Sequence, residues 1–155
     1  MVTTGKVISI CGVTFSGKTT LLLRLLHIFP ELYTINFESI IDFNRSSSSN
    51  YKALYKKLDG LKADGIDVIT ECVRQLHYKS DLFIYVLPDY KRHTANADAF
   101  RAKYGSKNTY FRTAGVNVWN MRKSMVIHDE KNLFHYNSDK DFEKLVIRIK
   151  NVLGT

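Results

Sequence analysis

Residues 8–26, ISICGVTFSGKTTLLLRLL, place an apolar run, a loop framed by two glycines and a leucine-rich run directly after one another. The apolar run is short and rich in β-branched residues, which favours a buried strand over 6–11. The leucine-rich run is stopped by Pro30, which favours a helix over Thr19–Phe29. The stretch therefore predicts a strand, a tight loop and a helix in immediate succession.

The loop itself, GVTFSGKT at residues 12–19, has the spacing G-x-x-x-x-G-K-[ST] without a mismatch. Its glycines let the backbone turn so that several N–H groups face one anion, and its lysine adds a cation for the β- and γ-phosphates. The Thr19 hydroxyl is expected to ligate Mg²⁺, and the helix start adds the positive end of its dipole. The sequence thus predicts a nucleoside-triphosphate site with the binding residues Gly12, Val13, Thr14, Phe15, Ser16, Gly17, Lys18, Thr19 and Thr20.

The rest of the chain alternates strand-like and helix-like segments. Further strands are expected at 32–37, 66–73 and 82–87, and the last two are apolar runs of the kind buried on both faces of a parallel sheet. Helices are expected at 51–65, at 93–104 and after Ser138, which forms a capping-box signal with Asp141. The segments 124–128 and 132–137 are strand candidates, whereas NRSSSSN at 44–50 is expected to be a flexible loop without a packing role. This alternation predicts an α/β fold with helices on both faces of a parallel sheet.

Length and composition favour a single globular domain over 1–155. No signal peptide is visible, and the longest leucine run is too short to span a membrane, so a cytoplasmic location is expected. The two cysteines, Cys11 and Cys72, lie far apart in apolar runs and lack metal-binding spacing. We expect buried, reduced thiols at both positions.

The net charge of +8 is unevenly placed along the chain. Between Lys91 and Lys123 there are eight Lys and Arg residues against the single acid Asp98, a local charge of +7. Charge this localised favours one anionic ligand site or face, and a solvated basic surface is the alternative.

The phosphate loop and its flanks resemble those of P-loop NTPases, a family with a three-layer α/β fold. The segment DVITE at 67–71 looks like the family's second element, a hydrophobic strand that ends in an acid acting on Mg²⁺ or its waters. By this resemblance, Glu71 is the metal-side carboxylate, and the sheet has five mostly parallel strands with helices on both faces.

Motif content separates the branches of that family. A GTPase would carry an Asn/Thr-Lys-x-Asp guanine reader after a strand and a D-x-x-G switch. The nearest match, YKSD at 78–81, begins with tyrosine and precedes the strand that it should follow, and no D-x-x-G switch is found. These departures disfavour a GTPase.

The chain looks most like the small P-loop kinases of the nucleoside and nucleotide kinase group. Such kinases carry an acid at the end of the second strand that faces the acceptor hydroxyl. Here Glu38 lies at the end of the second strand candidate, in YTINFES at 33–39, and Asp42 follows four residues after Glu38. The resemblance implies a proton-accepting role for Glu38 and acceptor binding by Asp42 and Arg74.

These kinases also place an arginine-rich lid after the fourth strand. The basic segment of about 89–123 follows LFIYVLPD in the same way, so Arg92 and Arg101 are expected to stabilise the transferring phosphoryl group, with Arg112 as a further candidate. Aromatic residues interleave this segment, which would equally suit a surface for nucleic acid. Near the end of the chain, Asn137 and Ser138 are candidates for contacting the adenine, with a plain helix cap as the alternative.

The motifs of the kinase subfamilies do not identify the molecule that accepts the phosphate. Deoxynucleoside kinases show Glu-Arg-Ser after the third strand, where this chain has Glu71-Cys72-Val73, and the Asp-Gly-x-Pro-Arg element of nucleoside monophosphate kinases is absent. The resemblance implies an ATP- and Mg²⁺-dependent phosphotransferase acting on a nucleoside, a nucleotide or a polynucleotide 5′ end. The alternative is a non-kinase P-loop NTPase or accessory switch module, whether ATPase, GTPase or MobB-like.

Overall fold

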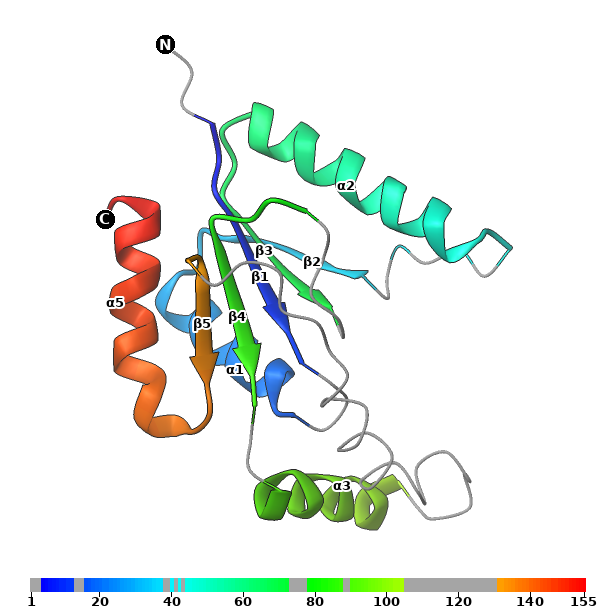
Figure 1. Ribbon diagram of the computed structural model, residues 1–155, viewed down its shortest axis with the longest axis vertical. Helices are drawn as coiled ribbons and strands as arrows, with labels where there is room; N and C mark the ends of the chain where they lie inside the picture. Colours follow the sequence, from blue (N-terminus) through cyan, green and yellow to red (C-terminus); the bar gives the residue numbers. More distant parts are fainter. Residues whose placement is uncertain are drawn as a thin grey trace.

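The computed structural model describes residues 4–12, 16–37, 40, 42, 44–72, 78–87, 90–104 and 131–155. Within these ranges, five strands form one central sheet in the order β2-β3-β1-β4-β5 (Figure 1). All neighbouring strands run parallel, so the predicted mostly parallel sheet is confirmed. The strands are β1 (Val7–Cys11), β2 (Tyr33–Asn36), β3 (Val68–Cys72), β4 (Leu82–Val86) and β5 (Leu133–Tyr136).

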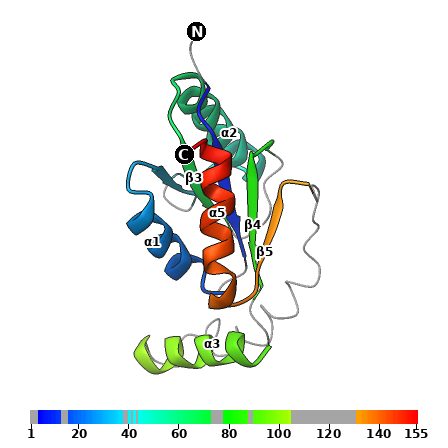
Figure 2. The same ribbon diagram turned by 90° about the vertical axis from the view of Figure 1, so that its left-hand side faces the viewer.

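Helices cover both faces of the sheet, which confirms the predicted three-layer α/β fold. The helices α1 (Lys18–Ile28) and α5 (Phe142–Leu153) lie on one face and α2 (Ser47–Ala63) on the other (Figures 1 and 2). The remaining helix, α3 (Tyr90–Tyr104), lies beyond the carboxyl ends of the central strands. It starts earlier than predicted, because Lys91 and Arg92 are good helix formers.

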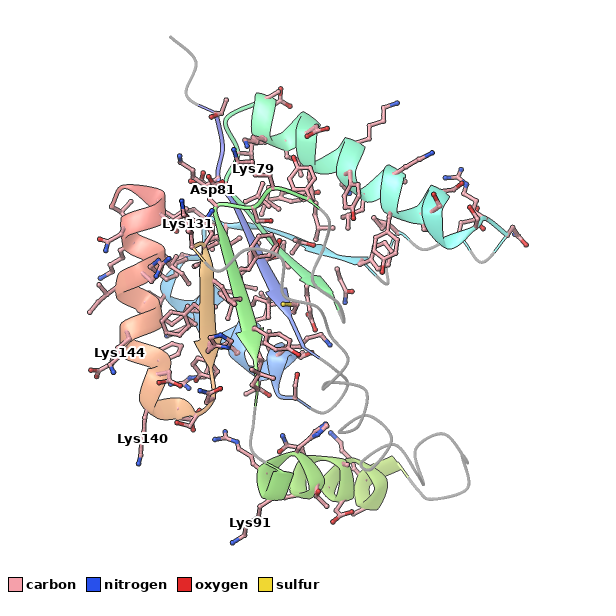
Figure 3. The ribbon with its side chains drawn as sticks, in the orientation of Figure 1. Lys79, Asp81, Lys91, Lys131, Lys140 and Lys144 are labelled. Atoms are coloured by element: carbon pink, nitrogen blue, oxygen red, sulfur yellow. The ribbon has the colours of Figure 1, made fainter. Side chains whose placement is uncertain are left out.

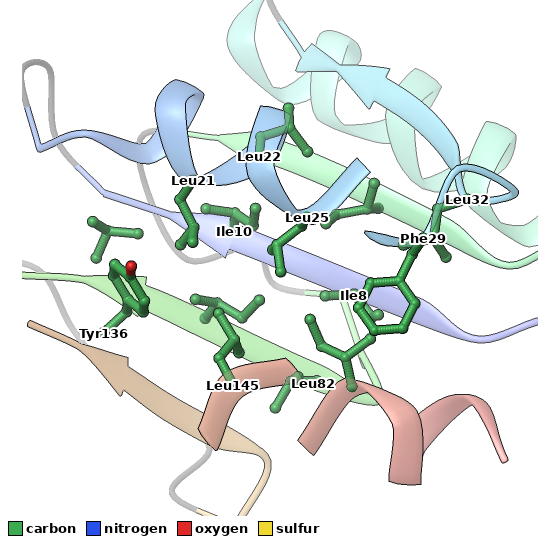
Figure 4. Close-up of a cluster of buried hydrophobic side chains, with 14 residues drawn as sticks. Ile8, Ile10, Leu21, Leu22, Leu25, Phe29, Leu32, Leu82, Tyr136 and Leu145 are labelled. Atoms are coloured by element: carbon green, nitrogen blue, oxygen red, sulfur yellow. The ribbon is translucent and has the colours of Figure 1, made fainter. Parts of the chain in front are cut away.

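The larger core lies between the sheet and the α1–α5 layer. Leu21, Leu22 and Leu25 of α1 lie over Ile8 and Ile10 of β1 (Figure 4). Burying one such side chain contributes about 1.5–3 kcal/mol to folding. Because these leucines must stay over β1 to remain buried, their packing holds the start of α1 close to the end of β1. A smaller core under α2 contains Val7, Ile35, Phe37, Leu54, Leu58 and Val68.

Aspartates fix the amino ends of the central strands. The backbone N–H of Lys6 donates to Asp67 at 2.8 Å, and that of Val7 donates to Asp81 at 2.9 Å. Figure 3 shows Asp81 at this end of the sheet, away from α3. Asp67 and Asp81 thus satisfy the backbone N–H groups at the amino end of β1. They lie at the opposite end of the sheet from the loop that follows β1.

The segment 44–50 is not the flexible loop that the sequence predicted. Ser46 caps α2 by accepting a hydrogen bond from the Ser49 N–H at 3.2 Å, and the helix begins at Ser47. Asn50 is buried and bonds the backbone of Asp42 in both directions, at 3.0 and 3.2 Å. A serine run is therefore recruited into the helix because one serine caps it and one asparagine ties it to the preceding turn.

The C-terminal helix starts as predicted. Ser138 and Asp141 form a capping box around the short 3₁₀ turn η2 (Asp139–Asp141), which leads directly into α5. In the described part of the chain, no helix is long and apolar enough to cross a membrane.

Candidate active site

The phosphate loop joins the carboxyl end of β1 to the start of α1, and the backbone is tightly placed at both of its glycines. A Cβ atom on Gly12 would lie 2.7 Å from Ser16 Oγ and 3.3 Å from Val86, so a side chain there would force Ser16 and Val86 to shift. Gly17 has a φ of 92°, in the left-handed region that other residues rarely adopt. Val13, Thr14 and Phe15 fall outside the described residues.

The first backbone N–H groups of α1 and the nearby Ser16 hydroxyl have no hydrogen-bond acceptor or partner among the described residues. The first turn contains no acidic residue, and no side chain among the described residues caps it. The first N–H groups of a helix have no acceptor within it, so those of Lys18, Thr19 and Thr20 gather partial positive charge at this point. Ser16 Oγ is buried and has no hydrogen-bond partner within the described residues. A buried orphan hydroxyl beside an uncapped helix start fits a phosphate group.

Lys18, Thr19 and Glu71 meet at this loop. The Thr19 hydroxyl donates to Glu71 Oε1 at 2.9 Å, and Lys18 Nζ lies 3.8 Å from the same oxygen. Glu71 is only 8% exposed and stands one residue before the end of β3, in register with Ile10 of β1. Parallel strands end at a common edge, and this brings residues 52 positions apart into contact.

The donor set suits Mg²⁺. A hydroxyl and a carboxylate are hard oxygen ligands, and Mg²⁺ typically takes one or two protein ligands and fills its other positions with water and phosphate oxygens. Among the described residues, no group of three or more His, Cys, Asp or Glu side chains could hold a metal ion by itself. An ion held by Thr19 and Glu71 would thus need water and phosphate oxygens as its other ligands, and the metal role of these two residues stays a prediction.

The predicted acceptor residues fall only partly within the described chain. Glu38 and Arg74 lie outside it. The carboxylate of Asp42 accepts a hydrogen bond from the Asn44 N–H at 2.9 Å and lies 3.5 Å from Arg45 Nε. Asp42 thus holds the turn that leads into α2, and its role in acceptor binding stays a prediction.

The basic segment is described only as far as Tyr104. Arg92 lies in the first turn of α3, and Lys91 points away from the sheet (Figure 3). Nothing is described of the Arg101 side chain, and Arg112 lies beyond the described part of α3. The lid-like segment at about 89–123 therefore remains a prediction beyond its first helix.

Arg92 belongs to a cluster that the sequence did not indicate. Arg92 Nη2 lies 3.5 Å from Asp139 Oδ1, and Arg24 Nη1 lies 3.3 Å from the same oxygen. The Tyr136 hydroxyl also donates to this oxygen, at 3.3 Å. The cluster joins α1, α3 and the turn after β5, and no sequence spacing pairs positions so far apart.

The pKa of the Tyr136 hydroxyl in this cluster is raised above its ordinary value. Burial raises the pKa of Tyr136, and the negative charge of Asp139 raises it further, while Arg24 opposes the change. The phenol therefore stays protonated at neutral pH and can donate its hydrogen bond to Asp139.

A groove of about 520 Å³ runs along α1 from Thr20 to Ile28. The Arg24 guanidinium stacks over the Phe142 ring, 3.8 Å from its centroid, and forms part of the wall. The lining residues are Thr20, Leu23, Arg24, His27, Ile28 and Phe142. A groove with apolar walls and a flat cation can accommodate a planar group.

The two base-contact candidates take part in the cap. The backbone N–H groups of Asn137 and Ser138 donate to Asp141 Oδ2 at 2.9 and 3.3 Å. The Ser138 hydroxyl accepts from the Lys140 N–H at 3.3 Å. These hydrogen bonds form the helix cap that the sequence offered as the alternative role of Asn137 and Ser138. A contact of either residue with an adenine base stays a prediction.

The fold of this chain is similar to that of several solved structures, among them three kinases. A sugar kinase from Janibacter sp. HTCC2649 matches with a TM-score of 0.67 and 13% identity, over 97% of this chain and 95% of its own. A thymidylate kinase from Candida albicans matches with a TM-score of 0.59 and 13% identity, over 97% and 92%. A gluconokinase from Sinorhizobium meliloti 1021 matches with a TM-score of 0.60 and 11% identity, over 99% and 94%.

These identities are low, so the matches show the fold alone, a five-stranded parallel sheet with helices on both faces. No family model and no curated protein matches the sequence.

Proposed function

We propose that this protein is a P-loop kinase that transfers the γ-phosphate of ATP to a nucleoside, a nucleotide or a polynucleotide 5′ end. One observation carries the proposal: Lys18, Thr19 and Glu71 meet at an uncapped helix start on the carboxyl edge of a parallel sheet. Ligands of open parallel α/β sheets bind at this edge. The fold shared with small kinases supports transfer over simple binding.

The roles of the three residues follow from their charges. Lys18 is close to Glu71 and would turn toward the β- and γ-phosphates when a triphosphate enters. Thr19 and Glu71 would hold Mg²⁺, which neutralises charge on the transferring phosphoryl group. The backbone N–H groups at the start of α1 and the Ser16 hydroxyl would bind the remaining phosphate oxygens.

The acceptor side rests on residues after β2 and β3. Glu38 would accept the proton of the attacking hydroxyl, and Asp42 and Arg74 would orient the acceptor. Arg92 and Arg101 of α3 would stabilise charge during transfer and exclude water. For Arg92 this requires leaving Asp139, an ion pair whose two side chains are 48% and 65% exposed.

The groove beside α1 is the proposed place for the base of the donor nucleotide. It begins at Thr20, directly after the Mg²⁺-binding threonine, and its stacked Arg24 and Phe142 offer a flat surface. A base there would stack against the guanidinium as bases do on cationic planes elsewhere.

A transfer assay with γ-labelled ATP tests the proposal. The acceptor panel contains nucleosides, mononucleotides, 5′-hydroxyl oligonucleotides and small sugars or sugar acids, the last because two similar structures are a sugar kinase and a gluconokinase. We expect slow hydrolysis of ATP alone and fast turnover with one class of acceptor. Release of free phosphate at the same rate with every acceptor would contradict a kinase and favour the accessory NTPase.

Lys18→Ala tests the nucleotide site itself. Loss of one charge-assisted contact to phosphate is worth about 1.5–3 kcal/mol, so ATP binding should weaken by about 10–100-fold and turnover should be lost. Calorimetric titration with ATP measures the binding, and Lys56→Ala, at an exposed lysine of α2, is the matched control. Unchanged affinity and activity in Lys18→Ala would refute the nucleotide site.

A further inference from the structure

A single carboxylate oxygen joins three elements beside the groove that runs along α1. Asp139 Oδ1 lies 3.3 Å from Arg24 Nη1 of α1 and 3.5 Å from Arg92 Nη2 of α3. The same oxygen accepts a hydrogen bond from the Tyr136 hydroxyl at 3.3 Å. The Arg24 guanidinium also lies over the Phe142 ring, and both side chains line the groove. One side chain of the turn after β5 therefore contacts both the wall of the groove and the first turn of α3.

We propose that Asp139 is a positioning residue that holds the Arg24 guanidinium over Phe142 as a platform for the base of the donor nucleotide. The inference rests on the proposed function, because it needs a nucleotide whose base lies in the groove. In this role Asp139 does not touch the reacting atoms. It acts through Arg24, by restricting a long side chain that would otherwise sample many rotamers.

The turn that carries Asp139 is fixed by its own hydrogen bonds. Ser138 and Asp141 form a capping box around η2, and Phe142 follows as the first residue of α5. Asp139 and Phe142 therefore belong to one capped turn, and they hold the Arg24 guanidinium from its edge and from its face. The ring fixes the height of the guanidinium, whereas the carboxylate at the edge fixes its rotation above the ring.

Tyr136 anchors the carboxylate from the side of the core. The Tyr136 side chain is 6% exposed and packs in the larger core, under α1 and α5 (Figure 4). Its hydroxyl donates to Asp139 Oδ1 and accepts a hydrogen bond from Arg24 Nη1 at 3.5 Å. A donor that is held by core packing limits where an exposed carboxylate can lie. The position of Asp139 is therefore set from the core as well as by its two arginines.

The contacts of Asp139 suit a role in orientation better than a role in folding. Arg24, Arg92 and Asp139 are all exposed, and ion pairs between exposed side chains stabilise a fold only slightly. If Arg92 leaves to reach the transferring phosphoryl group, Asp139 still pairs with Arg24 and Tyr136. Loss of the Asp139 charge should therefore change the order of the Arg24 side chain far more than the stability of the protein.

Affinities for Mg²⁺-ATP and for inorganic Mg²⁺-triphosphate, which has no base, separate this role from a simple charge effect. Asp139→Asn removes one negative charge, and that change acts on both anions alike. Only ATP uses the platform, so the ratio of the triphosphate Kd to the ATP Kd should fall by about 2–10-fold, the cost of ordering one arginine side chain. Asp64→Asn, at an exposed aspartate after α2, is the matched control and should leave the ratio unchanged. Equal changes for both ligands in Asp139→Asn would overturn the positioning role.

NMR relaxation of the arginine side chains tests the positioning without any nucleotide. In the wild-type chain the Arg24 Nε–Hε signal, assigned with Arg24→Lys, should show the restricted motion of an ordered side chain. In Asp139→Asn the same signal should show the fast motion of an unrestrained arginine. A signal that is equally mobile in both chains would overturn the inference. If this difference holds but the wild-type chain does not bind ATP, the proposed function fails, whereas the ordering of Arg24 by Asp139 stands.

Discussion

Among the described residues, the carboxylate of Glu71 contacts the hydroxyl of Thr19 and the ammonium group of Lys18. Two element boundaries place these three residues: the start of α1 carries the lysine and the threonine, and the end of β3 carries the glutamate. The close contacts hold Thr19 and Glu71, the two proposed Mg²⁺ ligands, together at the loop. Preorganisation of this kind lowers the cost of ordering the site during binding.

Glu71→Gln is expected to weaken the apparent affinity for Mg²⁺ by about 10–100-fold. The amide oxygen still accepts a hydrogen bond from Thr19, so the loop keeps its shape while the site loses a negative charge. A Mg²⁺ titration of ATP turnover measures the effect, with Glu31→Gln, at an exposed glutamate, as the matched control. Identical titrations for Glu71→Gln and the wild-type chain would exclude this carboxylate from the metal site.

Glu38→Gln separates binding from transfer. The amide cannot take the proton of the acceptor hydroxyl, so transfer should fall by about 10²–10⁴-fold while ATP affinity stays at the wild-type value. Calorimetry and the γ-labelled transfer assay report the two quantities in parallel. If the variant transfers phosphate normally, the proton must go to Asp42 or Glu71 instead.

At the scale of single elements, α2 shows how local polar contacts extend a helix. Its first turn consists of serines, which have only moderate helix propensity. The Ser46 cap and the pairing of Asn50 with the Asp42 backbone compensate for that composition. The turn that carries Asp42 is thereby fixed to α2, next to the acceptor side of the proposed site.

Ser46→Ala should lower the free energy of unfolding by about 1 kcal/mol, because the Ser49 N–H loses its acceptor. Urea denaturation followed by circular dichroism measures the difference. Ser48→Ala is the matched control, since Ser48 is exposed within the first turn and alanine is the better helix former. Equal stability of the two variants would show that the cap contributes nothing.

At the scale of the whole molecule, Tyr78 connects the segment before β4 to α2 through a hydrogen bond and a ring contact. The Tyr78 hydroxyl donates to Asp59 of α2 at 2.6 Å, and its ring packs beside Tyr55 with centroids 5.5 Å apart. Burial raises the pKa of Tyr78 well above its ordinary value, and the hydrogen bond to Asp59 and the nearby acidic charges raise it further.

This raised pKa predicts a loss of stability in alkali. The folded chain holds the phenolic proton more tightly than the unfolded chain, so the stabilisation is complete below the unfolded pKa of about 10 and declines as the pH rises above it. Tyr78→Phe lacks this contribution, so its stability difference from the wild-type chain should shrink above that pH. Denaturation across the alkaline range measures it, with Tyr33→Phe as the control for removing an exposed hydroxyl. A constant difference would contradict the prediction.

Much of the fold and part of the site could be predicted from local pattern. The apolar runs at 66–73 and 82–87 predict buried parallel strands, and the glycine spacing predicts the phosphate loop, because both signals lie within a few consecutive residues. The serine run was misjudged because polarity alone does not distinguish a capped helix start from a loop. The Asp139 cluster was missed because Arg24 and Arg92 reach it from two other elements.

The sequence by itself determined the phosphate loop, the alternation of strands and helices, and the capped start of the last helix, since each depends on neighbours along the chain. Only the tertiary structure decided which distant residues meet. The parallel register of β1 and β3 sets Glu71 beside Thr19. The physical reason is that strand order and register arise from burying the α1–α5 and α2 faces together, which no single segment encodes.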